Sequence, residues 1–289
     1  MASTELPAGL DRDETLALVR VALDEDLRYG PDVTTAATVP ADAVATASVV
    51  PRSPGTVAGI DIGLLVLDEV LGAGDYEVLD RAVDGHRAAA GEAVLTVQAP
   101  TRGLLTAERT MLNLMCHLSG IATATAQWVD AVAGTDAKIR DSRKTLPGLR
   151  ALQKYAVRVG GGVNHRMGLG DAALIKDNHV VAAGSVVAAL RAVRAQAPDL
   201  ECEVEVDSLE QFDEVLAENV ELILLDNFPL WQTQIAVQRR NTHAPQTRLE
   251  SSGGLTLDVA ADYARTGVDY LAVGALTHSV TVLDLGLDM

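Results

Sequence analysis

The sequence predicts an α/β protein, with an N-terminal α+β sandwich-like domain followed by an incomplete parallel β/α barrel. Aromatic residues make up only 3% of the chain, so the core must be built from aliphatic side chains, which favours α/β layers. From residue 137 onward, short β-branched runs alternate with helical stretches, as in parallel strands joined by right-handed crossovers. Six such units follow one another without an obvious reversal of order, which favours a barrel over the alternative, a doubly wound open sheet.

The first domain, residues 1–115, has a mixed pattern of helices and strands. The segment 13–30 predicts a helix with Asp13 as its N-cap and Gly30 just past its end. Further along, the pattern predicts strands over 43–50 and 93–100, a helix over 59–72, and two helices within 104–134 that divide near Gly120.

The second domain, residues 116–289, carries the barrel. Its strands are expected at 137–140, 172–176, 202–206, 222–226, 247–252 and 270–274, with helices at 184–197, 208–218 and 257–267. The last residues, 281–289, form a further strand to which the pattern assigns no partner. The C-terminal tail, residues 276–289, is expected to pack back on the N-terminal domain.

The charge of the chain limits its partners. A formal net charge of -17 argues against general binding to nucleic acid or to an anionic membrane, because both repel an acidic surface. The first residues show no secretory signal, and no apolar run approaches the length of a membrane span. Cys116 and Cys202 are expected to be buried free thiols of a reducing compartment, so we expect a cytoplasmic protein.

The positive charge is concentrated in one segment, Lys138–Lys176. These 39 residues hold nine basic residues, including all four lysines of the protein, and only Asp141 and Asp171 oppose them. A basic cluster within an acidic chain points to a small anionic ligand. Arg150, Lys154 and Arg158 are spaced four residues apart, so we expect them to be solvated or structural on a helix face.

Polar or glycine residues follow every expected barrel strand, and in a parallel barrel these strand ends form the ligand-binding rim. Arg143 and Arg166 suit carboxylates or phosphates, while Lys144 and Lys176 are compact charges. Glu205 and Asp226, on successive strands, suit Mg²⁺ held together with a polyphosphate, or sugar hydroxyls. The rim residues after the six strands are Asp141 to Lys144, Lys176 to His179, Glu205 and Asp207, Asp226 and Asn227, Ser251 to Gly254, and Gly274.

The last two of these loops suit a phosphate monoester. "SSGGL" at 251–255 precedes a helix, and together with "VGAL" at 273–276 it can turn backbone N–H groups toward a phosphate. Two other patterns are rejected. "GLGDAA" at 168–173 precedes a strand, whereas a dinucleotide-binding turn must follow one. The six histidines show no pair at metal-ligand spacing, which argues against zinc; His165, in the basic segment, is either an anion contact or structural.

Taken together, these segments resemble the quinolinate phosphoribosyltransferase family (nicotinate-nucleotide pyrophosphorylase, carboxylating; type II phosphoribosyltransferases). The likeness covers most of the chain, and it departs at Pro31, where the family's "GDVTT" has glycine; proline fixes φ, so that turn is expected to differ locally. The matching segments are "GPDVTT", "AERTMLNLMCHLSGIAT", "DSRKTLPGLR", "KYAVRVGGGVNHRMGLGD", "LIKDNH", "EVEVDSLEQ", "LILLDNF" and "ESSGGL".

The resemblance implies a glycosyltransferase of NAD biosynthesis that moves phosphoribosyl from 5-phosphoribosyl 1-diphosphate to quinolinate, with Mg²⁺, giving nicotinate mononucleotide, diphosphate and CO₂. It implies a homodimer or larger oligomer in which Arg109 reaches the neighbouring subunit's site. It assigns the substrate anions to Arg143, Lys144, His165, Arg166 and Lys176, the ribose and metal to Glu205 and Asp226, and the 5′-phosphate to Ser252, Gly253, Gly254, Val273, Gly274 and Ala275. Ser142 is expected to join the substrate-binding set, and Lys144, Lys176, Glu205 and Asp226 are the expected catalytic residues.

Three alternatives remain open from the sequence alone. Lys176 could form a Schiff base in an aldolase-like barrel that cleaves sugar phosphates. The 252–254 turn could serve a non-catalytic sugar-phosphate binder. A related transferase could act on nicotinate or another pyridine carboxylate.

Overall fold

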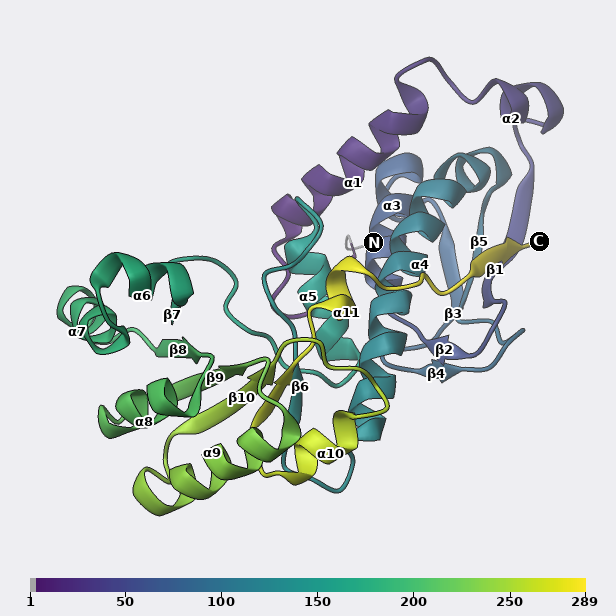
Figure 1. Cartoon of the computed structure of the whole chain (residues 1–289). Coiled ribbons are helices and arrows are strands. Elements are labelled where there is room, and N and C mark those ends of the chain that lie inside the picture. The colour runs from purple at the N-terminus through teal and green to yellow at the C-terminus, as the bar shows by residue number, and fades with distance from the viewer. Residues whose placement is uncertain (1–3) are drawn as a thin grey trace. The chain divides into compact units, whose positions relative to one another are not determined.

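The computed structural model describes residues 4–289, and the chain divides into two compact units (Figure 1). The first unit holds the chain up to Ala126 together with Leu146–Gly161 and Ser279–Met289, and the second holds Gln127–Thr145 and Gly162–His278. The expected single boundary after residue 115 is therefore not where the chain divides. Helix α4 (Thr101–Ala131) runs through that position without a break, and two later segments return to the first unit.

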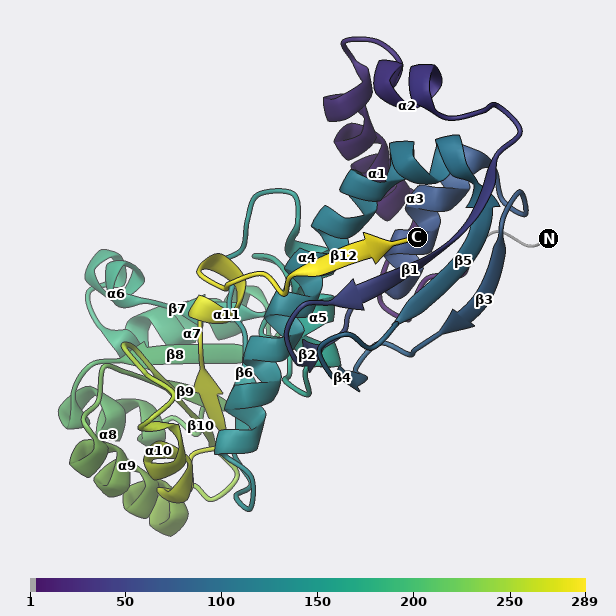
Figure 2. The same ribbon diagram turned by 90° about the vertical axis from the view of Figure 1, so that its right-hand side faces the viewer.

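The first unit contains a four-stranded antiparallel sheet that its helices cover on one face (Figure 2). Its strand order is β12-β1-β5-β3, and a separate two-stranded sheet pairs β2 with β4. The C-terminal strand β12 pairs with β1, which supplies the partner that the sequence pattern left unassigned (Figure 2). The strands are β1 (Val44–Pro51), β2 (Gly55–Thr56), β3 (Glu77–Arg81), β4 (Arg87–Ala88), β5 (Leu95–Pro100) and β12 (Leu285–Asp288).

The helices of the first unit bury aliphatic and methionine side chains against this sheet. Leu65 and Leu67 of α3, Met111 and Met115 of α4, and Val97 of β5 are almost fully buried in one cluster. This composition follows from the scarcity of aromatic residues. The helices are α1 (Arg12–Leu27), α2 (Val33–Thr38), α3 (Ile60–Leu71), α4 and α5 (Arg150–Val159).

Three details of the first unit differ from the sequence pattern. Helix α1 is capped by Asp11, whose carboxylate accepts a hydrogen bond from the Glu14 N–H, so Asp13 lies inside the helix. Helix α4 does not divide at Gly120. A Cβ there would lie 2.4 Å from the Thr281 carbonyl oxygen, so this glycine allows the C-terminal segment to approach the helix. On α5, Lys154 is fully buried while Arg158 is exposed.

The second unit is a six-stranded parallel sheet in the order β6-β11-β10-β9-β8-β7. Every pair of consecutive strands from β7 to β11 is adjacent, and β11 returns to pair with β6. The two outer strands, β6 and β7, do not pair with each other, so the sheet is a barrel that stays open between them. This strand order excludes the doubly wound alternative. The strands are β6 (Lys138–Arg140), β7 (Ala173–Ile175), β8 (Cys202–Val206), β9 (Leu222–Asp226), β10 (Arg248–Ser252) and β11 (Tyr270–Ala272).

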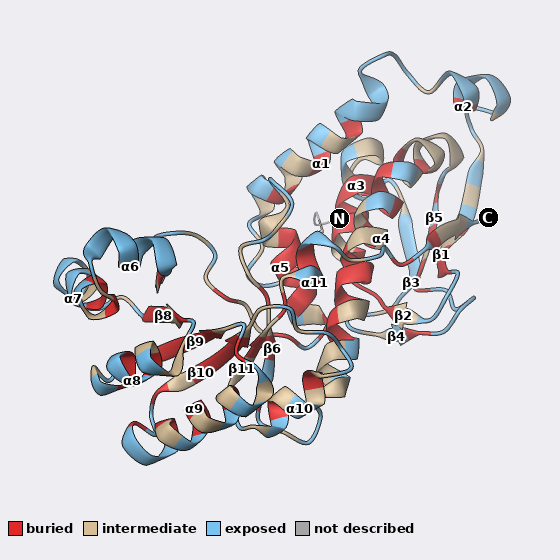
Figure 3. Cartoon of the chain, viewed as in Figure 1, coloured by how far each residue is buried: buried red, intermediate tan, exposed pale blue. Residues whose placement is uncertain are grey.

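Helices link and cover these strands, and the strands are buried over most of their length (Figure 3). Ser185 and Ser208 cap α7 and α8 by accepting backbone N–H bonds three residues on, as their position before an apolar run predicts. Helix α9 was not predicted, because its apolar residues are few. The helices are α6 (Asp177–Ala183), α7 (Val186–Gln196), α8 (Leu209–Ala217), α9 (Leu230–His243), α10 (Ala260–Arg265) and α11 (Ala275–His278). Across residues 4–289, no helix combines the length and apolar character needed to cross a membrane.

Candidate active site

A cavity of about 440 Å³ opens among the barrel strands of the second unit, at their carboxyl ends. Its walls come from the loops after β6 and before β7 and from the ends of the other strands. The lining residues are Asp141, Ser142, Arg143, Lys144, His165, Arg166, Leu174, Lys176, Glu205, Leu224, Asp226, Glu250, Ser252, Ala272 and Gly274. The strand ends therefore converge on one site, as parallel topology requires.

Most of the residues expected at the site lie in this cavity. Ser142, Arg143, Lys144, His165, Arg166, Lys176, Glu205, Asp226, Ser252 and Gly274 all line it. Gly253 and Gly254 follow Ser252, and Val273 and Ala275 flank Gly274, without lining the cavity themselves. Arg109 belongs to α4 in the first unit, where its side chain is 64% exposed.

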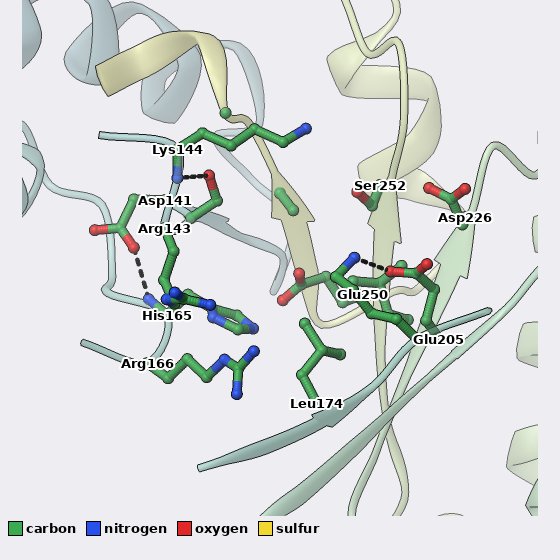
Figure 4. A pocket seen from close by; sticks show the side chains of 15 residues that line it. Asp141, Arg143, Lys144, His165, Arg166, Leu174, Glu205, Asp226, Glu250 and Ser252 are labelled. Carbon is green, nitrogen blue, oxygen red and sulfur yellow. Dashed lines mark hydrogen bonds and ion pairs between the residues drawn. The ribbon is translucent and has the colours of Figure 1, made fainter. Parts of the chain in front are cut away.

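Charge is divided across the cavity (Figure 4). The labelled side chains of Arg143, His165 and Arg166 lie on one side, with Asp141 beside them, and Lys144 extends across the top of the view. The carboxylates of Glu205 and Asp226 lie on the other side. Burial, and then repulsion from Arg143, lowers the pKa of the Arg166 guanidinium. Two guanidinium groups that repel each other in a partly buried wall favour an anionic ligand between them.

A buried carboxylate holds the loop that carries the basic side chains. Asp141 is fully buried directly after β6, and its Oδ1 accepts a hydrogen bond of 2.8 Å from the backbone N–H of His165. Its Oδ2 accepts one of 2.5 Å from the Asn164 side chain. The loop end of β6 and the 163–166 loop are thus joined, and this places His165 and Arg166 at the cavity wall.

At the base of the cavity, where His165 and Glu250 line it, the barrel interior is charged although an aliphatic core is usual. His165 Nε2 lies 2.5 Å from Glu203, and Arg140 donates a 2.7 Å hydrogen bond to Glu250 while its guanidinium stacks 4.6 Å from the Tyr270 ring centre. Burial raises the pKa of both Glu203 and Glu250 to about 7, and in Glu250 repulsion from Glu203 adds to this effect. The two carboxyl groups favour sharing one proton, because two adjacent buried charges repel.

The opposite wall pairs a lysine with a carboxylate. Lys176 Nζ lies 2.5 Å from Glu205, and the Lys176 N–H donates to His179 Nδ1 at the start of α6. Asp226 ends β9, one strand from Glu205, and accepts a 2.8 Å hydrogen bond from the Asn227 side chain. These two carboxylates present oxygen atoms to the cavity from neighbouring strands.

Glycines occupy the two loops that follow β10 and β11, at the edge of the cavity. Gly253 and Gly254 both have positive φ, 94° and 60°, in the turn after β10. A Cβ on Gly274 would lie 3.1 Å from Lys144 Cδ and 3.5 Å from Ser142 Oγ, so a side chain there would crowd the wall. Gly253 and Gly274 are thus positions where backbone and neighbouring side chains approach closely.

Four residues that line the cavity were not predicted from the sequence, although the two-residue period of a strand would have identified them. Each lies two positions before an expected rim residue on its strand, and side chains two apart face the same side. These residues are Leu174, Leu224, Glu250 and Ala272. The same rule finds Glu203, two positions before Glu205.

The fold and this cavity define an open β/α-barrel protein whose pocket is lined by several basic side chains together with the carboxylates of Glu205 and Asp226. Residues 32–119 match the N-terminal domain of quinolinate phosphoribosyl transferase, and residues 121–288 match its C-terminal domain. The chain belongs to the quinolinate phosphoribosyl transferase family.

Individual relatives agree with this assignment. The chain is 73% identical over 271 residues, covering 94% of this chain and 95% of the relative, to the nicotinate-nucleotide pyrophosphorylase [carboxylating] of Mycobacterium leprae. It is 40% identical over 247 residues to a probable enzyme of the same name from Bacillus subtilis, covering 84% and 83%. The solved nicotinate-nucleotide pyrophosphorylase of Francisella tularensis superposes with a TM-score of 0.90 at 34% identity, covering 100% of this chain and 99% of that one.

Proposed function

We propose that this protein transfers phosphoribosyl from 5-phosphoribosyl 1-diphosphate to quinolinate and releases CO₂, forming nicotinate mononucleotide and diphosphate. The observation that carries this proposal is the division of charge across the cavity. Quinolinate has two carboxylates and the other substrate has several phosphate charges. Such molecules repel each other unless fixed cations neutralise both of them.

The bond changes need no nucleophile from the protein. The C1–oxygen bond of the ribose breaks and its electron pair leaves with diphosphate, and the pyridine nitrogen of quinolinate supplies the pair for the new C1–N bond. The C2–carboxylate bond then breaks, CO₂ departs, and the electron pair left on C2 takes up a proton. The positively charged ring nitrogen next to C2 stabilises that pair.

In this proposal, the side chains of the cavity bind and orient the substrates. Arg143 and Arg166 present flat guanidinium groups that suit the quinolinate carboxylates. Lys144 and Lys176 offer point charges to the departing diphosphate. The wall is fixed before substrates arrive, by Asp141 on one side and by the strand ends on the other, and such preorganisation lowers the barrier without further reorganisation.

We further propose Mg²⁺ as the cofactor, with Glu205 and Asp226 as the residues that hold it, directly or through water. Both are hard oxygen donors on adjacent strands in the cavity, and Mg²⁺ in phosphate sites is usually held by one or two carboxylates plus the substrate phosphates. When bound, the ion would offset the charge of the departing diphosphate. His165, Glu203 and Glu250 also lie close together, but the imidazole and the paired Arg140 suit this ion poorly.

One feature of Lys176 argues against the Schiff-base alternative. Its Nζ is ion-paired with Glu205 and its side chain is 48% exposed. A lysine that attacks a carbonyl needs a neutral amine, which an apolar pocket or a neighbouring cation provides. The paired lysine is better suited to hold a phosphate oxygen.

We propose a homodimer, at least, in which Arg109 reaches the neighbouring subunit's site. The Arg109 side chain is 64% exposed, and the nearest carboxylate that pairs with it, on Glu108, is 3.9 Å away. In the same unit, Val21, Tyr29 and Val33 are large apolar residues that are mostly exposed. In the proposed dimer, a neighbouring subunit would cover side chains of this kind.

A cytoplasmic location is part of the proposal. Cys116 and Cys202 are both free, and burial raises the pKa of the Cys202 thiol to about 11, which keeps it protonated and unreactive. Unpaired cysteines are the ordinary state in a reducing compartment.

The decisive experiment mixes the protein with quinolinate, 5-phosphoribosyl 1-diphosphate and Mg²⁺ and measures CO₂, diphosphate and mononucleotide together. The proposal predicts equal yields of the three products. A parallel reaction with nicotinate in place of quinolinate tests the related transferase. Mononucleotide from nicotinate and none from quinolinate would contradict the proposed substrate.

A further inference from the structure

Asn227 has an unusual backbone conformation at the edge of the cavity. It is one of two non-glycine residues with positive φ among residues 4–289, at 56°; the other is Asn219, at 52°. Asn219 lies in the turn after α8, whereas Asn227 follows β9 directly after Asp226. A non-glycine residue in this region is held there by its surroundings, so the conformation calls for an explanation.

Three contacts depend on this conformation. The Asn227 side-chain amide donates a 2.8 Å hydrogen bond to Asp226 Oδ2, and its backbone N–H donates one of 2.8 Å to the Ser252 carbonyl. Its Oδ1 lies against Gly253, where an added Cβ would be only 2.2 Å away. Asn227 therefore touches both the carboxylate at the end of β9 and the glycine turn at the end of β10.

We propose that Asn227 is a positioning residue that fixes the Asp226 carboxylate relative to the Ser252–Gly253 turn. This inference rests on the proposed function, in which the carboxylate serves the ribose and metal, and the turn serves the 5′-phosphate. The ribose and the 5′-phosphate belong to the same substrate. Asn227 therefore sets the separation between the two protein groups, the Asp226 carboxylate and the Ser252–Gly253 turn, that bind 5-phosphoribosyl 1-diphosphate. Asn227 itself touches no substrate in this account.

The chemistry of the side chain explains why asparagine stands here. Glycine would adopt the same φ without strain but would offer no donor to Asp226. Aspartate tolerates this region too, but it would place a second carboxylate against the first. Asparagine supplies the donor and also tolerates the conformation.

The prediction is selective for one substrate. The basic wall that holds quinolinate, with Arg143 and Arg166, lies on the other side of the cavity from Asp226 (Figure 4). Loss of the Asn227 contacts should therefore weaken binding of 5-phosphoribosyl 1-diphosphate and Mg²⁺ while leaving quinolinate binding unchanged.

The test compares Asn227→Gly and Asn227→Asp with Asn219→Gly, a matched control that changes the same residue type in the same backbone region away from the cavity. Both Asn227 variants should raise the KM for 5-phosphoribosyl 1-diphosphate about tenfold, the typical effect of losing one hydrogen bond to a charged group. The KM for quinolinate and the Tm should stay near wild type, and Asn219→Gly should change neither KM. An unchanged KM for the phosphoribosyl substrate, or equal changes in both KM values, would overturn the inference.

A binding measurement separates this inference from the proposed reaction. Thermal unfolding of wild type and Asn227→Gly is followed with and without 5-phosphoribosyl 1-diphosphate and Mg²⁺, in the absence of quinolinate. Greater stabilisation of wild type than of the variant supports the inference even if no CO₂ is formed with quinolinate, a result that would contradict only the proposed function. Equal stabilisation of both proteins overturns it.

Discussion

The buried carboxyl pair beneath the cavity predicts a specific dependence of stability on pH. Burial raises the pKa of Glu203 to about 7, from its ordinary value of 4.5. Below pH 4.5 the folded and unfolded chains both hold the proton. Between that pH and about 7 the unfolded chain releases a proton that the folded chain keeps, so the free energy of unfolding falls as the pH rises. Above about pH 7 the folded chain also releases the proton, and the free energy of unfolding does not fall further.

The structure also gives the size of the effect. At about 1.4 kcal/mol for each pH unit, a shift from 4.5 to about 7 corresponds to a loss of about 3 kcal/mol. Glu203 and Glu250 contribute to this pH dependence together, because ionisation of either one disfavours ionisation of the other. We therefore expect the folded pair to retain one proton rather than two. His165 and Arg140 face the pair from the 163–166 loop and β6.

Glu203→Gln imitates the protonated group and should remove most of this dependence. Urea unfolding of wild type and variant at pH 5.5 and pH 8 measures it, with Glu214→Gln, an exposed change on α8, as the control. Because about 1.5 of these pH units lie above pH 5.5, the stability of the variant relative to wild type should rise by about 2 kcal/mol between the two pH values, and that of the control should not. Parallel pH profiles for wild type and Glu203→Gln would refute the reasoning.

Three further outcomes follow from the site. Arg166→Ala should lower kcat/KM roughly 100-fold, as expected for losing one fixed donor, while Arg191→Ala on α7 should not; a wild-type rate for the first variant would contradict its role. Chelation of Mg²⁺ should stop product formation, and Asp226→Asn should raise the Mg²⁺ concentration needed for half-maximal rate; an unchanged requirement would remove Asp226 from the metal site. Inactive Arg109→Ala and Arg166→Ala subunits, once mixed and exchanged, should regain about a quarter of wild-type activity, because half the dimers then carry one intact shared site; no recovery would contradict sharing.

Local sequence patterns were enough to locate the barrel strands and most of the cavity. All six strands lie within the expected ranges, because short segments with aliphatic or β-branched residues alternate there with helical stretches. The rim residues followed from parallel topology, since such strands end at one edge. The inward residues Leu174 and Glu250 were missed because the strand period was not applied backward from the rim.

The parts that local patterns left open or missed depend on contacts between distant segments. No local pattern shows that β12 pairs with β1, or that 146–161 belongs with the first unit. Spacing of four placed Lys154 on a helix but could not show that its face is buried. Glycine at position 120 suggested a break in α4, whereas the reason for it is the close approach of the C-terminal segment.

The central claim is that a fixed basic wall brings two mutually repelling anions together. The most direct test is a crystal structure of the protein with quinolinate, diphosphate and Mg²⁺, which together cannot react. Both anions should lie in the cavity, within hydrogen-bonding distance of Arg143, Lys144, Arg166 or Lys176, and Mg²⁺ should lie near Glu205 and Asp226. Either anion bound elsewhere, with these side chains turned to solvent, would contradict it.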